Sequence, residues 1–335
     1  MSDHQPRSAN AARNGKPFQK PSNGLVQDKM VCVVVEEVGH LKYKPCDKTK
    51  NSLRYDILPE DLEDLRAGDV IVVNVSSQKG TPQLSLTRFL GNKTSPGIQS
   101  LISIYERGLS AVFSAAAENE TKGMAVPALD GREDLRDLPL VTIDGADARD
   151  FDDAVFAEKT ADGGFHLIVA IADVSYYVRP GSALDQDAYE RGNSTYLPDR
   201  VLPMLPEALS NELCSLKPHE DRACLAFHLY IDAAGNLTGQ KIVRGLMRSA
   251  ARLTYKQVQE AKDGAPDAMT TPLMDTVIHP LYEAYAALRG ARERRGALDM
   301  GAPEYKVSVD TQGTATGVKR YESRDSDNVI VEFLV

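Results

Sequence analysis

The sequence has few cysteines, no tryptophan and no long apolar run. Its 335 residues include four cysteines, and none of them forms a C-x-x-C pair or a zinc-ribbon spacing. Four scattered thiols in a chain of this length are typical of a reducing compartment, so we expect a cytoplasmic protein. No apolar run approaches the roughly 18 residues that a membrane helix needs. The first 24 residues also lack the apolar core of a secretory signal. These absences argue against membrane association and against secretion.

Glycine and proline are modest too, at 24 and 18 residues, whereas 42% of the chain is hydrophobic. This composition excludes collagen-like and wholly disordered proteins and allows a sizeable core. The formal charge of −9 argues against nucleic-acid binding driven by the overall charge of the chain. However, nine acidic residues and three arginines between positions 130 and 153 contribute −6 of that charge. The acidity is therefore concentrated in one segment.

The first part of the chain divides into three segments. Residues 1–24 carry a charge of +3 and few apolar side chains, which predicts a disordered basic arm, either inert or in contact with RNA. Residues 25–92 contain short β-branched runs around one short helical stretch, which predicts a small OB-type β-barrel. Tyr43 and Tyr55 are candidates there for stacking on RNA bases, although a purely structural barrel is equally open. Residues 93–132 read as a linker with a helix.

Residues 133–335 alternate short apolar strands with helical patterns, which predicts a mixed α/β domain and an α+β fold class for the whole chain. A hairpin is expected around a turn at 311–313, and the apolar end of the chain at 328–335 lacks a helix C-cap signal. The predicted strands are 140–143, 154–158 and 165–172, and the predicted helices are 206–213, 249–262 and 272–295.

An acidic motif is the most informative feature of the chain. Five aspartates fall within ten residues between two predicted strands. Carboxylates packed this closely are unfavourable unless a cation compensates them or some are protonated. Oxygen donors without sulfur or histidine suit a hard cation, Mg²⁺ or Mn²⁺ first and Ca²⁺ as an alternative. The five residues are Asp144, Asp147, Asp150, Asp152 and Asp153.

This motif has other interpretations. An EF-hand needs acidic positions one, three and five followed by glycine, and no such triplet is present. A solvated acidic turn, or a Ca²⁺-stabilised loop without catalysis, stays open. A carboxylate-held pair of metal ions is suited to phosphodiester hydrolysis, which the residues alone leave compatible with a phosphatase, a nuclease or a nucleotidyl transferase.

Several segments resemble the RNB-domain exoribonucleases, the family of ribonucleases II and R, with the closer similarity to the ribonuclease R branch. The similarity covers 133 to the C-terminus, and residues 25–90 are similar to the cold-shock OB domain that precedes the RNB domain. The segments that carry it are 134–144, 150–155, 169–178, 202–206, 209–211, 213–216, 251–255 and 295–299.

The resemblance implies a processive, hydrolytic 3′→5′ exoribonuclease that releases nucleoside 5′-monophosphates. By position, Asp144, Asp150, Asp152 and Asp153 match the acidic quartet that binds Mg²⁺ and carries catalysis, with Mn²⁺ as a possible substitute. Tyr196 matches the tyrosine that clamps the RNA 3′ end. Tyr255 matches another tyrosine of the RNA channel, which completes the predicted site of these six residues. The expected partner is the 3′ end of single-stranded RNA, acted on by a monomer.

The sequence also departs from the family pattern. The family continues beyond residue 335 with an arginine motif, whose guanidinium would stabilise charge on the scissile phosphate, and with a C-terminal RNA-binding domain. We therefore expect an incomplete RNB domain, truncated at its C-terminus, with weak or no activity. The alternative function is a non-catalytic RNA-binding fragment built from an OB domain and an incomplete RNB domain.

Overall fold

The computed structural model describes residues 28–50, 52–78, 81–298 and 303–334. These described residues divide into two compact units, with the boundary between Lys93 and Thr94. The basic arm expected at 1–24 lies outside the described residues. Across the described segments, no helix has the length and apolar character needed to cross a membrane.

The first unit is an OB-like antiparallel sheet of five strands in the order β3-β2-β1-β4-β5. The β-branched run in β1 alternates its side chains, so that Cys32 and Val34 enter the core beside Ile71 of β4. The sequence pattern of short strands therefore produces the expected sheet. Its elements are β1 (Asp28–Glu37), β2 (His40–Pro45), β3 (Tyr55–Asp56), α1 (Pro59–Leu62), β4 (Asp69–Gln78) and β5 (Thr81–Asn92).

The tyrosines suggested for RNA stacking in this unit belong to its core. Tyr43 is fully buried, and its hydroxyl donates a hydrogen bond to Asp61 at 3.2 Å. Tyr55 is half-buried and packs against the same core. A stacking role for Tyr43 is therefore wrong, because its ring is covered by the protein's own apolar side chains.

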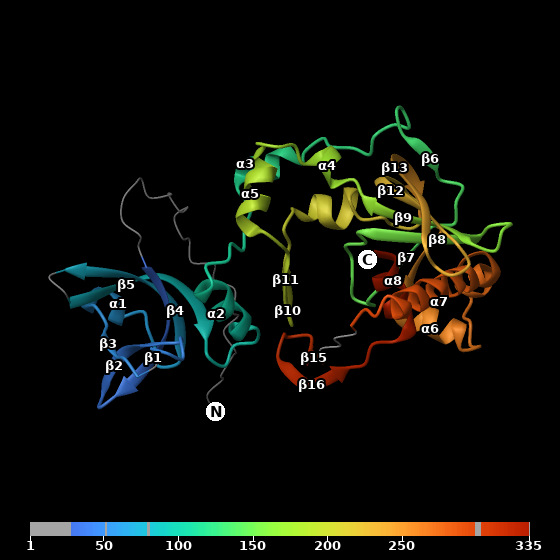
Figure 1. Cartoon of the computed structure of the whole chain (residues 1–335). Coiled ribbons are helices and arrows are strands. Elements are labelled where there is room, and N and C mark those ends of the chain that lie inside the picture. The colour runs from blue at the N-terminus through green and yellow to red at the C-terminus, as the bar shows by residue number, and fades with distance from the viewer. Residues whose placement is uncertain (1–27, 51, 79–80, 299–302, 335) are drawn as a thin grey trace, which may run out of the picture. The chain divides into compact units, whose positions relative to one another are not determined.

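The second unit is built on a mixed sheet of seven strands in the order β14-β7-β8-β9-β12-β13-β6 (Figure 1). Most neighbours are antiparallel, whereas β14 pairs with β7, and β6 with β13, in parallel. Two two-stranded hairpins, β10–β11 and β15–β16, complete the strands. The strands are β6 (Glu133–Leu135), β7 (Val141–Asp144), β8 (Asp153–Lys159), β9 (Phe165–Ala172), β10 (Thr195–Leu197), β11 (Arg200–Leu202), β12 (Asp221–Ile231), β13 (Leu237–Arg248), β14 (Ala251–Thr254), β15 (Glu304–Val309) and β16 (Ala315–Tyr321).

Helices cover both faces of this sheet, which explains why its central strands are apolar at successive positions. Ala154 and Phe156 of β8 face one core, on the side of the sheet where α5 and the π-helical turn η1 pack. Val155 and Ala157 face the other core, which α6, α7 and α8 close (Figure 1). The helices are α2 (Ile98–Glu106), α3 (Ala115–Glu120), α4 (Val174–Tyr177), α5 (Ala183–Arg191), η1 (Ala208–Leu213), α6 (Tyr255–Lys262), the short turns η2 (Thr271–Leu273) and η3 (Met274–Ile278), α7 (His279–Arg294) and α8 (Asp325–Leu334).

One predicted helix begins several residues later in the structure than the sequence indicates. The helix expected at 249–262 is a strand, β14, as far as Thr254, and only then the helix α6. Thr254 caps that helix, because its hydroxyl accepts the Gln257 N–H and the Gln257 side chain accepts the Thr254 N–H in return. The apolar end of the chain forms α8, whose buried face includes Val329 and Phe333.

Candidate active site

The topology of the sheet brings the two ends of the acidic motif together. Asp144 is the last residue of β7 and Asp153 is the first residue of β8. The two strands are antiparallel neighbours, with Val141 opposite Val155, so both aspartates lie at the same end of the sheet. Tyr255 joins them, because it follows β14, which runs parallel to β7 and places its last residue opposite Asp144.

The loop between these strands is fixed by main-chain hydrogen bonds. The Ala172 N–H at the end of β9 donates to the carbonyl oxygen of Asp152 at 2.9 Å. The Leu216 N–H donates to the carbonyl oxygen of Phe151 at 2.8 Å, and the Phe151 ring is buried in the core below. Asp150 and Asp152 therefore flank an anchored residue, which holds their side chains on the open side of the loop.

Electrostatic repulsion and burial disfavour the charged forms of these carboxylates. Loss of water contact, and next the charge of Asp153, raise the pKa of Asp144 to about 7. The pKa of Asp152 rises to about 6, mainly through lost hydration and further through Asp150 and Asp153. Burial also raises the pKa of Asp153. The cluster thus holds more negative charge than its surroundings stabilise.

The donors of this cluster suit a divalent cation. The Oδ2 atom of Asp144 is buried and has no hydrogen-bond partner among the described residues. An unsatisfied carboxylate oxygen in a crowded acidic cluster is the kind of group that a hard cation compensates. Within the described segments, however, no three acidic, histidine or cysteine side chains already form a set able to hold an ion. The residues therefore fit a metal by chemistry and charge, and binding requires their side chains to draw together.

Tyr196 stands beside the acidic loop on the small hairpin β10–β11, opposite Val201. Its side chain is 65% exposed, and its hydroxyl donates a hydrogen bond to Oδ2 of Asp150 at 2.8 Å. Partial burial, followed by this hydrogen bond, raises its pKa to about 12, so the phenol stays protonated and acts as the donor. The ring is therefore tied to the carboxylate cluster and still open to a ligand.

Tyr255 is half-buried at the other side of the cluster. Burial raises the pKa of its phenol, and the charges of Asp144 and Asp153 raise it further. The structure thus brings all six predicted residues to one end of the sheet. Asp147, which the family pattern leaves outside the quartet, is exposed in the loop.

A cavity of about 200 Å³ opens beside Asp150 and Asp152. Its walls are mostly apolar with a few polar groups, a composition that suits a nucleobase or a sugar next to a charged centre. Besides the two aspartates, the cavity is lined by Ile171, Ala172, Val174, Ser194, Met204, Leu205, Ser210 and Cys214.

One positively charged side chain at the site was not predicted from the sequence. Arg252 of β14 donates from Nη2 to the carbonyl oxygen of Gly145, and its guanidinium lies 5.2 Å from the centre of the Phe151 ring. Its charge lowers the pKa of Asp144 against the larger effects of burial and Asp153. Arg252 lies within the family-like segment 251–255, but nothing local shows that it reaches a loop 107 residues away.

Asp173, at the end of β9, belongs to a different group. It is fully buried, and its Oδ2 accepts hydrogen bonds from Arg132 at 2.8 Å and from Arg244 at 2.7 Å. Its Oδ1 accepts the hydroxyl of Ser175 at 2.8 Å, and its side chain does not cap α4. Asp173 therefore forms an ion cluster within the fold.

Comparison with known proteins identifies the family of this chain. Residues 132–335 match the family model of the RNB domain. The chain belongs to the RNB family. Among curated relatives, ribonuclease R of Vibrio cholerae is 39% identical over 310 residues, which cover 89% of this chain and 37% of that protein. Ribonuclease R of Escherichia coli is 40% identical over 295 residues, which cover 84% of this chain and 36% of that protein. The chain thus spans little more than a third of the length of these relatives.

Two solved structures share the fold of this chain. The structure of Mycoplasma genitalium RNase R in complex with ribose-methylated single-stranded RNA superposes with a TM-score of 0.85 at 23% identity, covering 95% of this chain and 53% of that one. Yeast Ssd1, described as a pseudonuclease, superposes with a TM-score of 0.62 at 15% identity, covering 82% and 35% of the two chains. The mixed α+β architecture expected from the sequence is confirmed.

Proposed function

We propose that residues 133–335 form the catalytic part of a hydrolytic, processive 3′→5′ exoribonuclease that uses Mg²⁺ and releases nucleoside 5′-monophosphates from single-stranded RNA. Membership of the RNB family supports the reaction class. The observation that carries the proposal is the cluster of four carboxylates at one end of the sheet, joined through Asp150 to the exposed ring of Tyr196.

In this proposal the quartet of Asp144, Asp150, Asp152 and Asp153 holds the metal. Bound there, Mg²⁺ would lower the pKa of a water and stabilise charge on the scissile phosphate, and Mn²⁺ is expected to substitute for it. A pKa of about 7 leaves Asp144 partly protonated at neutral pH, so ion binding displaces a proton from it.

The remaining residues of the site bind and orient the RNA end. The exposed face of Tyr196 offers a stacking surface for the 3′-terminal base, and stacking accepts every base, as a general degrader requires. Its hydroxyl donates a hydrogen bond to Asp150 while its ring stacks on the base. One side chain therefore sets the distance between the RNA and the carboxylate. Tyr255 lies near Asp144 and Asp153, whose charges raise the pKa of its phenol, and Arg252 offsets part of the negative charge beside Asp144.

The test uses single-stranded RNA labelled at its 5′ end, incubated with the chain in Mg²⁺, in EDTA and with the Asp152→Asn variant. We expect weak shortening of the RNA from its 3′ end in Mg²⁺ alone, with nucleoside 5′-monophosphates as products. Internal cleavage, or decay that survives both EDTA and Asp152→Asn, would refute the mechanism. RNA binding without hydrolysis, insensitive to both changes, would identify the non-catalytic alternative instead.

A further inference from the structure

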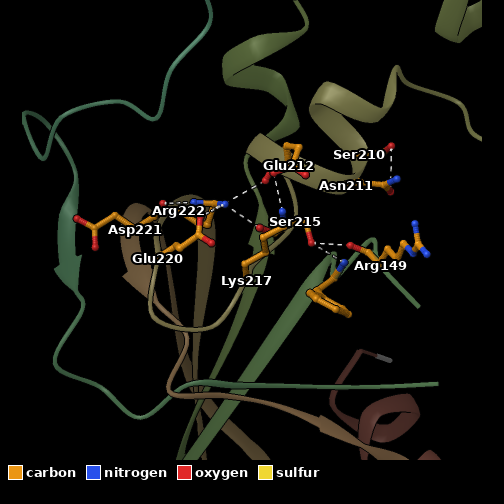
Figure 2. A network of polar contacts seen from close by, with 10 residues as sticks. Arg149, Ser210, Asn211, Glu212, Ser215, Lys217, Glu220, Asp221 and Arg222 are labelled. Carbon is orange, nitrogen blue, oxygen red and sulfur yellow. Dashed lines mark hydrogen bonds and ion pairs between the residues drawn. The ribbon is translucent and has the colours of Figure 1, made fainter. Parts of the chain in front are cut away.

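A buried serine outside the acidic motif ties the loop to the turn that follows η1. Ser215 has no exposed surface. Its hydroxyl donates to the carbonyl oxygen of Arg149 at 2.8 Å and accepts the N–H of Phe151 at 3.2 Å (Figure 2). These two main-chain groups lie on either side of Asp150, so one hydroxyl spans the backbone of a proposed metal ligand.

The turn that carries this serine is itself held from the sheet. Arg222 of β12 is buried, and its Nε donates to the carbonyl oxygen of Ser215 at 2.8 Å and to that of Glu212 at 3.2 Å (Figure 2). Its Nη2 donates to Glu220 at 2.6 Å, which pairs the charge. A connected series of hydrogen bonds therefore runs from β12 through the turn to the acidic loop.

The loop is held on both sides of Asp150 by this series. In addition to the two bonds of the hydroxyl, the Leu216 N–H donates to the Phe151 carbonyl oxygen at 2.8 Å. Both polar groups of the Phe151 peptide backbone are thus satisfied by residues 215 and 216. With the backbone fixed on either side, the Asp150 side chain has few remaining orientations from which to meet Tyr196 and an ion.

We propose that Ser215 is a positioning residue that presents Asp150, and through Phe151 also Asp152, for binding of the divalent cation. The inference rests on the proposed function, since it assigns the ion to that site. Serine suits the role because its hydroxyl donates and accepts at the same time. Alanine would leave the buried Phe151 N–H and the part-buried Arg149 carbonyl without this partner, and the loop would shift to satisfy them.

The test is Mg²⁺ binding by isothermal titration calorimetry, with Ser215→Ala and Ser215→Thr compared with the unchanged chain. Loss of supporting groups around metal ligands typically weakens binding about 10- to 100-fold. We expect at least a tenfold rise of the Mg²⁺ dissociation constant in Ser215→Ala and a smaller rise in Ser215→Thr, which keeps the hydroxyl. In RNA hydrolysis, the Mg²⁺ concentration at half-maximal rate should rise while KM for RNA stays constant.

Ser249→Ala is the matched control. This serine is also buried, and its hydroxyl donates to the Ala251 carbonyl oxygen at 3.0 Å, at the end of β14 away from Asp144. Its loss should leave Mg²⁺ affinity unchanged. Arg222→Lys provides a second variant, which keeps Ser215 and removes the guanidinium that supports its turn, and it should weaken Mg²⁺ binding in the same direction.

The outcomes separate the inference from the proposed function. If the unchanged chain binds no Mg²⁺, the proposed function fails. If it binds Mg²⁺, and a folded Ser215→Ala variant binds it with the same affinity, the positioning role of Ser215 is refuted. Thermal unfolding in EDTA shows which variants are folded. If Ser215→Ala is not folded, the Mg²⁺ affinity of Arg222→Lys tests the positioning role in its place.

Discussion

Replacing Asp144 by asparagine should stabilise the metal-free protein. The carboxyl has a pKa of about 7 in the fold against an ordinary value of 3.8, so folding disfavours its charged form, and the penalty is complete above pH 7. At about 1.4 kcal/mol per pKa unit, this difference corresponds to about 4 kcal/mol. Because the residue is half-buried, water screens part of the interaction, and we expect a gain of about 2 kcal/mol.

The gain has a defined pH dependence. A carboxyl whose pKa is raised by folding contributes no penalty below its unfolded pKa. It destabilises the fold progressively as the pH rises from that value to its folded pKa, above which the penalty is complete. The advantage of Asp144→Asn should therefore be full at pH 8, shrink between pH 7 and pH 4, and vanish near pH 4.

Differential scanning calorimetry in EDTA measures this effect, because the chain contains no tryptophan for fluorescence. A gain of about 2 kcal/mol corresponds to a rise in melting temperature of about 4–8 °C for a unit of this size. Asp147→Asn, in an exposed position of the same loop, is the control and should change the melting temperature little. A melting temperature of Asp144→Asn at or below that of the unchanged chain at pH 8 would refute the electrostatic reasoning.

Four further predictions follow from the site and the fold. Calorimetry of the unchanged chain in EDTA should show stability falling from about pH 4 to pH 7, because folding raises the pKa values of Asp144 and Asp152. Tyr196→Ala should weaken RNA binding by about 1–3 kcal/mol through lost stacking, and Tyr196→Phe should not, in anisotropy measurements with Ca²⁺. Arg252→Met should raise the pKa of Asp144 further, as read from carboxyl chemical shifts. Asp173→Ala should cost about 3–5 kcal/mol in urea unfolding, because it leaves buried arginine charge unpaired.

For each of these four predictions, one result would contradict the reasoning. Metal-free stability that rises between pH 4 and pH 7 would contradict the raised pKa values. Equal loss of RNA affinity in Tyr196→Phe and Tyr196→Ala would assign binding to the hydroxyl, and an unchanged titration of Asp144 in Arg252→Met would remove the arginine from the site. A neutral Asp173→Ala variant would show that its ion cluster does not stabilise the fold.

Local patterns predicted much of the fold. The apolar run 165–172 forms β9, because a strand covered on both faces needs apolar residues at successive positions. The helix expected at 249–262 was wrong at its start because pairing of Ala251–Thr254 with β7, a contact far along the chain, outweighs local helical preference. The hairpin β12–β13, the most extensive strand pair in the second unit, was not predicted.

The candidate site likewise contains residues that the sequence predicted and residues that it did not. Its carboxylates are close in sequence, so their density alone indicated a cluster. The residues that support them come from far along the chain: Ser215 contacts the loop across 66 positions, and Arg252 across 107. Such contacts depend on the strand order of the sheet, which no local pattern encodes.

The central claim is that the acidic loop holds a divalent cation, and Mn²⁺ titration followed by electron paramagnetic resonance tests it most directly. We predict saturable binding to the unchanged chain and to Asp147→Asn, and loss of that binding in Asp144→Asn and in Asp152→Asn. Binding that does not saturate, or that survives both of the latter substitutions, would contradict the claim.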